Sequence, residues 1–302
     1  MSQLQSLNDR FAGGGHVRFE AGPGGLTEAV MTTPAAEATV CLHGAHVCHY
    51  RPAGHDPVLF MSGSSRFETG EPIRGGVPIC FPWFGPRGGD AEAPNHGIAR
   101  LVEWAVESVE PAGPDAVRAV FRLASDGRFR DRFDHEFVLR HVVTVGPTLT
   151  MTLETHNPSD VPMTIEKALH TYLAVDDVRS IEVRGLEHTE YLDKVDGGRR
   201  KREGDGPATV TMETDRVYLA TTKTCTIDDP VLGRRITIDK DGSETTVFWN
   251  PWIDKARAME DFGDAEWPSM VCIETCAVGD HALSIDAGAT ARMTAVISVE
   301  KT

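Results

Sequence analysis

Short runs in which hydrophobic and polar residues alternate cover most of the chain. Examples are AVRAVFRLASDG and TLTMTLETHNPSD, and clusters of Gly, Pro, Asn or Asp separate such runs at short intervals. Alternation with a period of two is typical of β-strands that bury one face. Hardly any stretch keeps a helical period over ten residues, although KARAMEDF could form a turn or two. The pattern therefore predicts an all-β protein, built as a large antiparallel β-sandwich.

The strand pattern continues without a linker or a change in composition, so we expect a single domain over residues 1–302. Residues 1–15 end in three glycines and are expected to form a loose N-terminal arm. This N-terminus lacks the basic and apolar segments of a secretory signal. No apolar run approaches the roughly 20 residues of a membrane span, so we expect no membrane association.

Composition narrows the classes of partner. A hydrophobic fraction of 40% and a charged fraction of 25% are typical of a globular protein with a sizeable core. The formal net charge of −15 argues against nucleic acid, which requires clustered Lys and Arg, and restricts any phosphate site to a local basic pocket. The six cysteines include no CxxC pair and indicate buried thiols of a cytoplasmic protein.

Residues 71–100 hold an unusual density of special-purpose residues. Three prolines interrupt an apolar run after Gly75 and Gly76, which predicts an edge strand or an ordered loop with glycines at positive φ or in close contact. Arg74 and Arg100 flank this run and could form two sides of an anion site, because guanidinium groups match carboxylate or phosphate. The alternative is that Arg74 pairs with Glu71 or another carboxylate.

Two further residues are suited to proton transfer. His170 lies in the β-type run IEKALHTYLAV, and an imidazole offers both protonation states near neutral pH. Glu274 lies in MVCIETCAV, where an unpaired carboxylate would be costly to bury. The alternatives are that His170 is a hydrogen-bonded core residue, and that Glu274 pairs with an arginine or lies on the wet face of an edge strand.

A histidine-rich segment resembles a zinc site by composition alone. It contains Cys41, His43, His46, Cys48 and His49. In a strand, offsets of three place side chains on alternate faces, so we expect no metal site. The chain has no GxGxxG, P-loop or HExxH motif, and we expect no cofactor.

The segments IRGGVPICFPWFG and NHGIAR, followed by Trp104, resemble the signature of the hexose-6-phosphate mutarotases (glucose-6-phosphate 1-epimerases) in the aldose 1-epimerase superfamily. ALHTYL resembles the strand of that family's catalytic histidine, and the region around MVCIETCAV resembles its C-terminal block. The resemblance implies a galactose mutarotase-like supersandwich. It also implies that His170 is the general acid and Glu274 the general base in interconverting the α and β anomers of a D-hexose 6-phosphate.

The same resemblance implies the substrate contacts. Arg74 and Arg100 would bind the phosphate, and His96 would bind a hydroxyl or the ring oxygen. Asp193 would orient ring hydroxyls, with Asp196 and Lys194 as alternatives in the same loop. Asn95 stands where family members commonly carry Gln or Ser, and its side chain has a shorter reach.

The resulting expectation is a cofactor-free, metal-free, monomeric isomerase of the cytoplasm that acts on a small sugar phosphate. We expect the His170 imidazole and the Glu274 carboxylate to lie a sugar ring's width apart. The alternatives are an aldose 1-epimerase for unphosphorylated sugar and a non-catalytic carbohydrate-binding protein. Arg74→Ala separates the first alternative, because only a phosphorylated substrate should lose binding.

Overall fold

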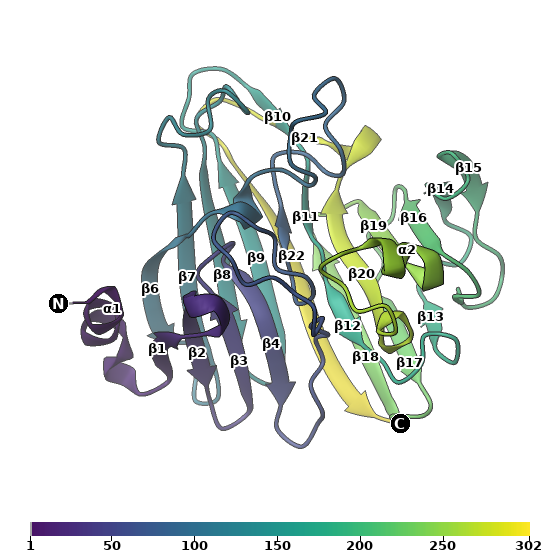
Figure 1. The fold of residues 1–302 in the computed structure, drawn as a ribbon, viewed down its shortest axis with the longest axis horizontal. Helices are drawn as coiled ribbons and strands as arrows, with labels where there is room; N and C mark the ends of the chain where they lie inside the picture. Colours follow the sequence, from purple (N-terminus) through teal and green to yellow (C-terminus); the bar gives the residue numbers. More distant parts are fainter. Residues whose placement is uncertain (1) are drawn as a thin grey trace.

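The computed structural model describes residues 2–302 and confirms that the fold is all-β and antiparallel (Figure 1). Two eight-stranded sheets form most of the molecule, and a four-stranded sheet and a two-stranded sheet accompany them. One cluster of buried hydrophobic side chains extends from Val17 to Ile297, and the single domain stays a prediction.

The first eight-stranded sheet runs in the order β13 (Glu182–Arg184), β17 (Cys225–Asp229), β18 (Arg234–Asp241), β22 (Thr290–Lys301), β9 (Leu149–His156), β8 (Val138–Val145), β7 (Val117–Ala124) and β6 (Ala105–Pro111). The second runs β15 (Arg199–Arg202), β14 (Glu190–Asp193), β16 (Thr214–Tyr218), β19 (Thr245–Asn250), β20 (Met270–Ala277), β11 (Lys167–Leu169) and β5 (Ile79–Cys80), and β12 (Tyr172–Ala174) also pairs with β20. The small sheets contain β1 (Val17–Ala21), β2 (Thr27–Thr32), β3 (Ala36–Cys41) and β4 (His46–Pro52), and the pair β10 (Met163–Ile165) and β21 (Leu283–Ile285).

The alternation of hydrophobic and polar residues matches the alternation of buried and less buried side chains along the strands. In β7 and β9 every second side chain is fully buried. By contrast, all eight residues of β20 are buried, as expected for a central strand covered on both faces. Glu274 therefore does not lie on the wet face of an edge strand. The proline-interrupted segment forms the edge strand β5 and an ordered loop, as predicted.

The N-terminus differs from the prediction of a loose arm. Gln3–Phe11 form helix α1, capped by the Ser2 hydroxyl, which accepts a hydrogen bond from the Gln5 N–H. Asn8 ties the helix to β1, because its side-chain oxygen accepts from the Phe19 N–H and its amide donates to the Phe19 carbonyl. The predicted turn in KARAMEDF appears as helix α2, Trp252–Ala258.

Each histidine of the zinc-like segment has its own partner. Nε2 of His43 and Nε2 of His46 bond the carbonyl oxygens of Glu71 and Gly75, both at 2.8 Å, and His49 approaches a different residue, Glu37. All six cysteines are buried and unpaired, as predicted. Within residues 2–302, no helix is long and apolar enough to cross a membrane.

We expect Gly76→Ala to destabilise the fold. Gly76 has φ of 55°, and a Cβ there would lie 2.3 Å from the Val47 carbonyl oxygen. The left-handed conformation alone costs a side chain roughly 1–3 kcal/mol. Urea unfolding measures the loss, with Gly88→Ala as the matched control, because a Cβ at Gly88 meets nothing within 4 Å. Equal unfolding free energies for the two variants would contradict this prediction.

Candidate active site

A cavity of about 840 Å³ lies over β19 and β20 and is closed by loops from the N-terminal third of the chain. It brings together six of the seven residues predicted from the sequence: Arg74, Asn95, His96, Arg100, His170 and Glu274. Trp249 also lines it, as do Lys194, Asp215 and Lys255. Residues as distant in the chain as Gly70 and Glu274 therefore share one solvent-accessible space.

His170 reaches the cavity because a strand is interrupted. Leu169 ends β11 opposite Thr275, and Tyr172 begins β12 opposite Cys272, so two residues between them leave the regular ladder beside β20. The His170 N–H donates to the Pro78 carbonyl across this break, which fixes the backbone. Glu274 lies on β20, beside the interruption between β11 and β12. On its other side, β20 pairs without interruption with β19, where Glu274 lies opposite Val247.

The two proposed catalytic side chains are in direct contact. His170 Nδ1 lies 3.3 Å from Glu274 Oε1, and both side chains are almost fully buried. His170 Nδ1 and both Glu274 carboxylate oxygens make no hydrogen bond within residues 2–302. The expectation that a sugar ring's width separates the two groups is therefore wrong.

The sugar ring opening that the family resemblance implies is compatible with adjacent groups. The anomeric hydroxyl oxygen and the ring oxygen of a hemiacetal are bonded to the same carbon, so an acid and a base that lie close together can serve both. A proton donor and acceptor within hydrogen-bond reach of these two oxygens can open and close the ring. The arrangement of His170 and Glu274 meets this requirement.

Burial controls the protonation of the pair. Desolvation raises the pKa of Glu274 well above its ordinary value, and the negative charge of Asp215 raises it further. Desolvation lowers the pKa of His170, and the nearby side chains of His96, Arg74 and Arg100 lower it further. Burial therefore favours a protonated carboxyl group beside a neutral imidazole, and the proton of the carboxyl group is available for exchange between them.

His96 is held as a neutral hydrogen-bond donor. Its backbone has φ of 61°, a conformation fixed by its N–H donating to Gly85 O and by its carbonyl accepting from the Phe81 N–H. The Gly85 N–H donates to His96 Nδ1 at 3.2 Å, which leaves the proton on Nε2. Burial, with Arg100 and Arg74 near by, lowers the pKa of His96. Its ring lies 5.5 Å from that of His170, between centroids.

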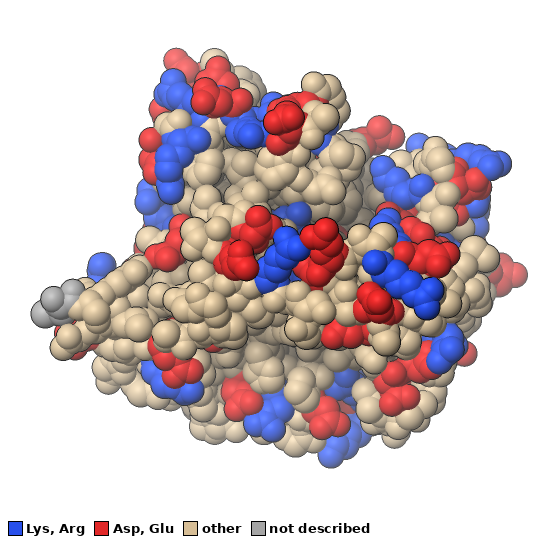
Figure 2. Space-filling model, in the orientation of Figure 1, with Lys and Arg blue, Asp and Glu red and all other residues tan. Residues whose placement is uncertain are grey.

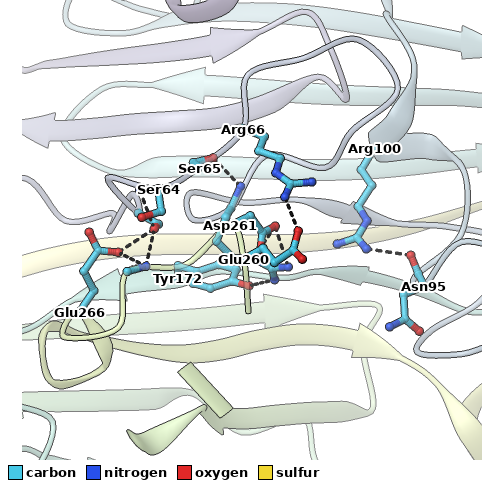
Figure 3. Close-up of polar contacts among 12 residues, drawn as sticks. Ser64, Ser65, Arg66, Asn95, Arg100, Tyr172, Glu260, Asp261 and Glu266 are labelled. Carbon is cyan, nitrogen blue, oxygen red and sulfur yellow. Dashed lines mark hydrogen bonds and ion pairs between the residues drawn. The ribbon is translucent and has the colours of Figure 1, made fainter. Parts of the chain in front are cut away.

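The two arginines have unlike surroundings. Arg74 Nε and Nη2 both bind Asp261 Oδ2, at 3.2 and 3.1 Å, and Arg74 Nη1 donates to the Tyr172 hydroxyl at 2.9 Å. The alternative that Arg74 pairs with a carboxylate is thus correct, with Asp261 as the partner. Figure 3 shows Asp261 and Tyr172 close together on one side of the site and Arg100 on the other.

Arg100 is a buried cation without a carboxylate partner. Only 6% of its surface is exposed, and it forms no ion pair within residues 2–302. Its Nη2 donates to the Asn95 carbonyl oxygen at 2.8 Å, and its buried Nε has no partner (Figure 3). Desolvation lowers the pKa of Arg100. Asn95 therefore contributes its backbone to this contact.

The structure leaves Asp193 outside the cavity, unlike the prediction. Its carboxylate bonds Lys201 Nζ at 2.7 Å. The next residue, Lys194, faces the cavity instead, and its N–H donates to the backbone oxygen of Asp215 on the neighbouring strand. Asp215 and Lys255 were not predicted from the sequence. Desolvation raises the pKa of Asp215, but this burial arises from the folded sheet and is not a local signal of the sequence.

We expect Asp215→Asn to move the basic limb of the pH–rate profile to lower pH. The His170–Glu274 pair must hold the proton of the carboxyl group to act, so the rate falls as the pH rises through the pKa of Glu274. Removing the charge of Asp215 removes one cause of the raised pKa, so that ionisation occurs at lower pH. The profile of kcat/KM against pH measures the shift. A limb that stays in place or moves upward would count against the coupling.

One group of residues could also hold a cation. Donor atoms of His170, Cys272 and Glu274 lie within 4.8 Å of one another, a donor set that suits Zn²⁺. However, burial raises the pKa of Cys272 well above its ordinary value, whereas metal binding requires the thiolate. A cation there would occupy the two side chains best placed for proton transfer.

Comparison with known proteins identifies relatives of this chain. The profile of the family described as aldose 1-epimerase matches residues 28–298. A protein of Escherichia coli K12 named "Putative glucose-6-phosphate 1-epimerase" is 35% identical over 246 residues, which cover 82% of this chain and 81% of that protein. A protein of the same name from Cenchrus ciliaris is 34% identical over 265 residues, covering 85% and 80%.

A solved structure shows the same fold. The crystal structure of the mutarotase-type protein YeaD from Salmonella typhimurium superposes with a TM-score of 0.89 at 31% sequence identity, and the match covers 95% of each chain. The fold, the extent of the family match and the identity to these relatives show that the chain is an epimerase-type isomerase and belongs to the aldose 1-epimerase family.

Proposed function

We propose that the protein interconverts the α and β anomers of a D-hexose 6-phosphate, with D-glucose 6-phosphate as the test substrate. His170 and Glu274 are the proposed acid and base, and Arg100 and Arg74 are the proposed phosphate ligands. The names of the relatives from Escherichia coli and Cenchrus ciliaris support this choice of substrate. The observation that carries the proposal is the buried, unneutralised guanidinium of Arg100 in the same cavity as the His170–Glu274 pair.

Charge balance favours an anionic substrate. Burying a cation without a partner is costly, and a bound phosphate would compensate Arg100 while accepting a hydrogen bond from its free Nε. Arg74 is already neutralised by Asp261, but its Nη groups keep further N–H bonds for a second contact. A neutral sugar would leave these donors unsatisfied, which is how the site would discriminate against it.

The protonation states of His170 and Glu274 support the reaction. Transfer of the proton from the Glu274 carboxyl group to Nδ1 of His170 produces a carboxylate beside an imidazolium. The carboxylate then takes the proton of the anomeric hydroxyl, while His170 Nε2 gives a proton to the ring oxygen as the bond between C1 and that oxygen breaks. Rotation about C1–C2 of the open aldehyde turns its other face, and the reverse transfers close the ring.

Other cavity residues are suited to positioning the sugar. His96 would donate a hydrogen bond from Nε2 to a hydroxyl or the ring oxygen. The Asp215 carboxylate would accept hydrogen bonds from ring hydroxyls, and the ammonium groups of Lys194 and Lys255 would donate to them. Trp249, 8% exposed, provides an apolar wall beside the His170 ring.

We also propose a cytoplasmic location and a monomer that needs no nucleic-acid or membrane partner. The six free thiols support the location. Lys and Arg alternate with Asp and Glu over the face shown in Figure 2, without the basic patch that nucleic acid requires. Analytical ultracentrifugation tests the oligomeric state, and a monomer should sediment with the mass of one chain, 32.9 kDa.

Anomer-exchange NMR with glucose 6-phosphate and glucose tests the function. We expect exchange of both anomers of glucose 6-phosphate above the spontaneous rate, and a kcat/KM for glucose lower by on the order of 10², equivalent to the loss of hydrogen bonds to charged groups. Equal kcat/KM values would indicate an epimerase for unphosphorylated sugar. Binding of either sugar without exchange would indicate a carbohydrate-binding protein.

A further inference from the structure

We propose that Tyr172 is a positioning residue that couples an anion at Arg74 to the orientation of the His170 imidazole. The inference rests on the proposed function and adds a regulatory link within the same site. The phosphate of the substrate would thereby promote the chemistry at C1 in addition to anchoring the molecule.

Tyr172 contacts both ends of the proposed site. Its hydroxyl accepts a hydrogen bond from Arg74 Nη1 at 2.9 Å. Its ring stacks on the imidazole of His170, with centroids 4.8 Å apart and an angle of 9° between the planes. Trp249 packs edge-on against both rings, with centroids 5.9 Å from Tyr172 and 6.0 Å from His170. A single rigid side chain therefore joins the anion-binding guanidinium to the proposed acid.

The backbone gives this link little freedom. Tyr172 opens β12 and pairs with Cys272 of the buried strand β20, two residues from Glu274. Its N–H donates to the Gly76 carbonyl and its own carbonyl accepts from the Phe60 N–H, which holds both sides of the chain. A shift at the hydroxyl is therefore transmitted through the ring to the face of the His170 imidazole.

The phenol can respond to an anion. Burial raises the pKa of Tyr172, so the hydroxyl keeps its proton. That proton has no acceptor in the hydrogen bonds formed by residues 2–302, since the hydroxyl only accepts from Arg74. An oxygen of a phosphate bound by Arg74 supplies the acceptor, which would complete the hydrogen bonding of the phenol and fix its ring against His170.

The opposite side of Arg74 is fixed. Asp261 holds Nε and Nη2, and the Arg74 N–H donates to the Ser65 hydroxyl at 2.8 Å (Figure 3). Because the guanidinium is anchored there, binding of an anion acts on the remaining contact, the bond from Nη1 to Tyr172.

Tyr172→Phe tests the link, because it removes the hydroxyl and keeps the ring. We expect the ratio of kcat for glucose 6-phosphate to kcat for glucose to fall about tenfold, the loss expected for one hydrogen bond to a charged group. A purely structural role would lower both kcat values equally, and a role in anion binding alone would raise only KM for glucose 6-phosphate. Either pattern would overturn the proposal.

Tyr50→Phe is the matched control. Tyr50 is also fully buried and also uses its hydroxyl in one hydrogen bond, to the Gly146 carbonyl at 3.0 Å. Its variant should leave the kcat ratio at the wild-type value. A tenfold fall in both variants would show a general effect of deleting a buried hydroxyl and would contradict the specific link.

A second readout does not depend on catalysis. Inorganic phosphate titrated into ¹⁵N-histidine-labelled protein should shift the imidazole resonances of His170, assigned with a His170→Gln variant, and Tyr172→Phe should reduce that shift. An equal shift in both proteins, or none in the wild type, overturns the coupling. If the wild type shows the phosphate-dependent shift but does not exchange glucose 6-phosphate anomers, the proposed function fails while the link stands.

Discussion

Glu274→Gln is expected to slow anomer exchange of glucose 6-phosphate by about 10²–10⁴, the usual worth of a positioned acid or base. Glutamine keeps the shape of the side chain but cannot accept the proton of the anomeric hydroxyl. The fold should persist, since glutamine keeps the size of the side chain and is neutral, like the protonated carboxyl group that burial favours. Exchange NMR measures the rate, and circular dichroism confirms folding.

Asp193→Asn provides the comparison for this experiment. Asp193 was predicted to touch the sugar, but its carboxylate bonds Lys201 outside the cavity. We expect an exchange rate within about twofold of the wild type, because the side chain lies outside the cavity and asparagine keeps its shape. Full exchange by Glu274→Gln would remove the assignment of the base, and a large loss in Asp193→Asn would return Asp193 to the site.

Arg100→Met is expected to lower kcat/KM for glucose 6-phosphate about 10²-fold and to leave that for glucose almost unchanged. The guanidinium would donate hydrogen bonds to the phosphate that methionine cannot supply. The variant should be no less stable than the wild type, because replacing a buried cation that has no carboxylate partner by an apolar side chain removes a desolvation cost. Kinetics with both sugars and urea unfolding measure the two effects.

Arg74→Met is the comparison variant for Arg100→Met. It also removes a proposed phosphate ligand, so kcat/KM for glucose 6-phosphate should fall. Unlike Arg100→Met, it should destabilise the protein, because Asp261, whose side chain is only 15% exposed, loses its partner. If both arginine variants leave the preference for glucose 6-phosphate intact, the phosphate site lies elsewhere.

Much of the fold and of the site could be predicted from local signals. Alternating runs predicted the strands, and three prolines after Arg74 predicted the edge strand β5 with its ordered loop. The family motifs identified six residues that line one cavity. The loose N-terminal arm was wrong, because Leu4, Leu7 and Phe11 repeat at helical spacing and pack against the core once β1 is present.

Asp193, at the end of β14 where this strand pairs with β16, shows the limit of motif matching. Asp193 and Lys194 are neighbours, and successive side chains of an extended chain point in opposite directions. The register places Lys194 opposite Asp215, and both side chains face the cavity, whereas Asp193 lies opposite Arg216 and turns toward Lys201. Register depends on pairing between strands and cannot be obtained from one segment.

The sequence by itself determined that the chain forms an antiparallel β-sandwich and which histidine, glutamate and arginines are suited to the chemistry. Only the tertiary structure decided that His170 and Glu274 touch at 3.3 Å, that Asp261 neutralises Arg74, and that Arg100 has no counter-ion within residues 2–302. The physical reason is that alternation and composition are local properties of a strand. Distances between charges arise from the pairing of strands about 100 residues apart in the chain, such as β12 and β20.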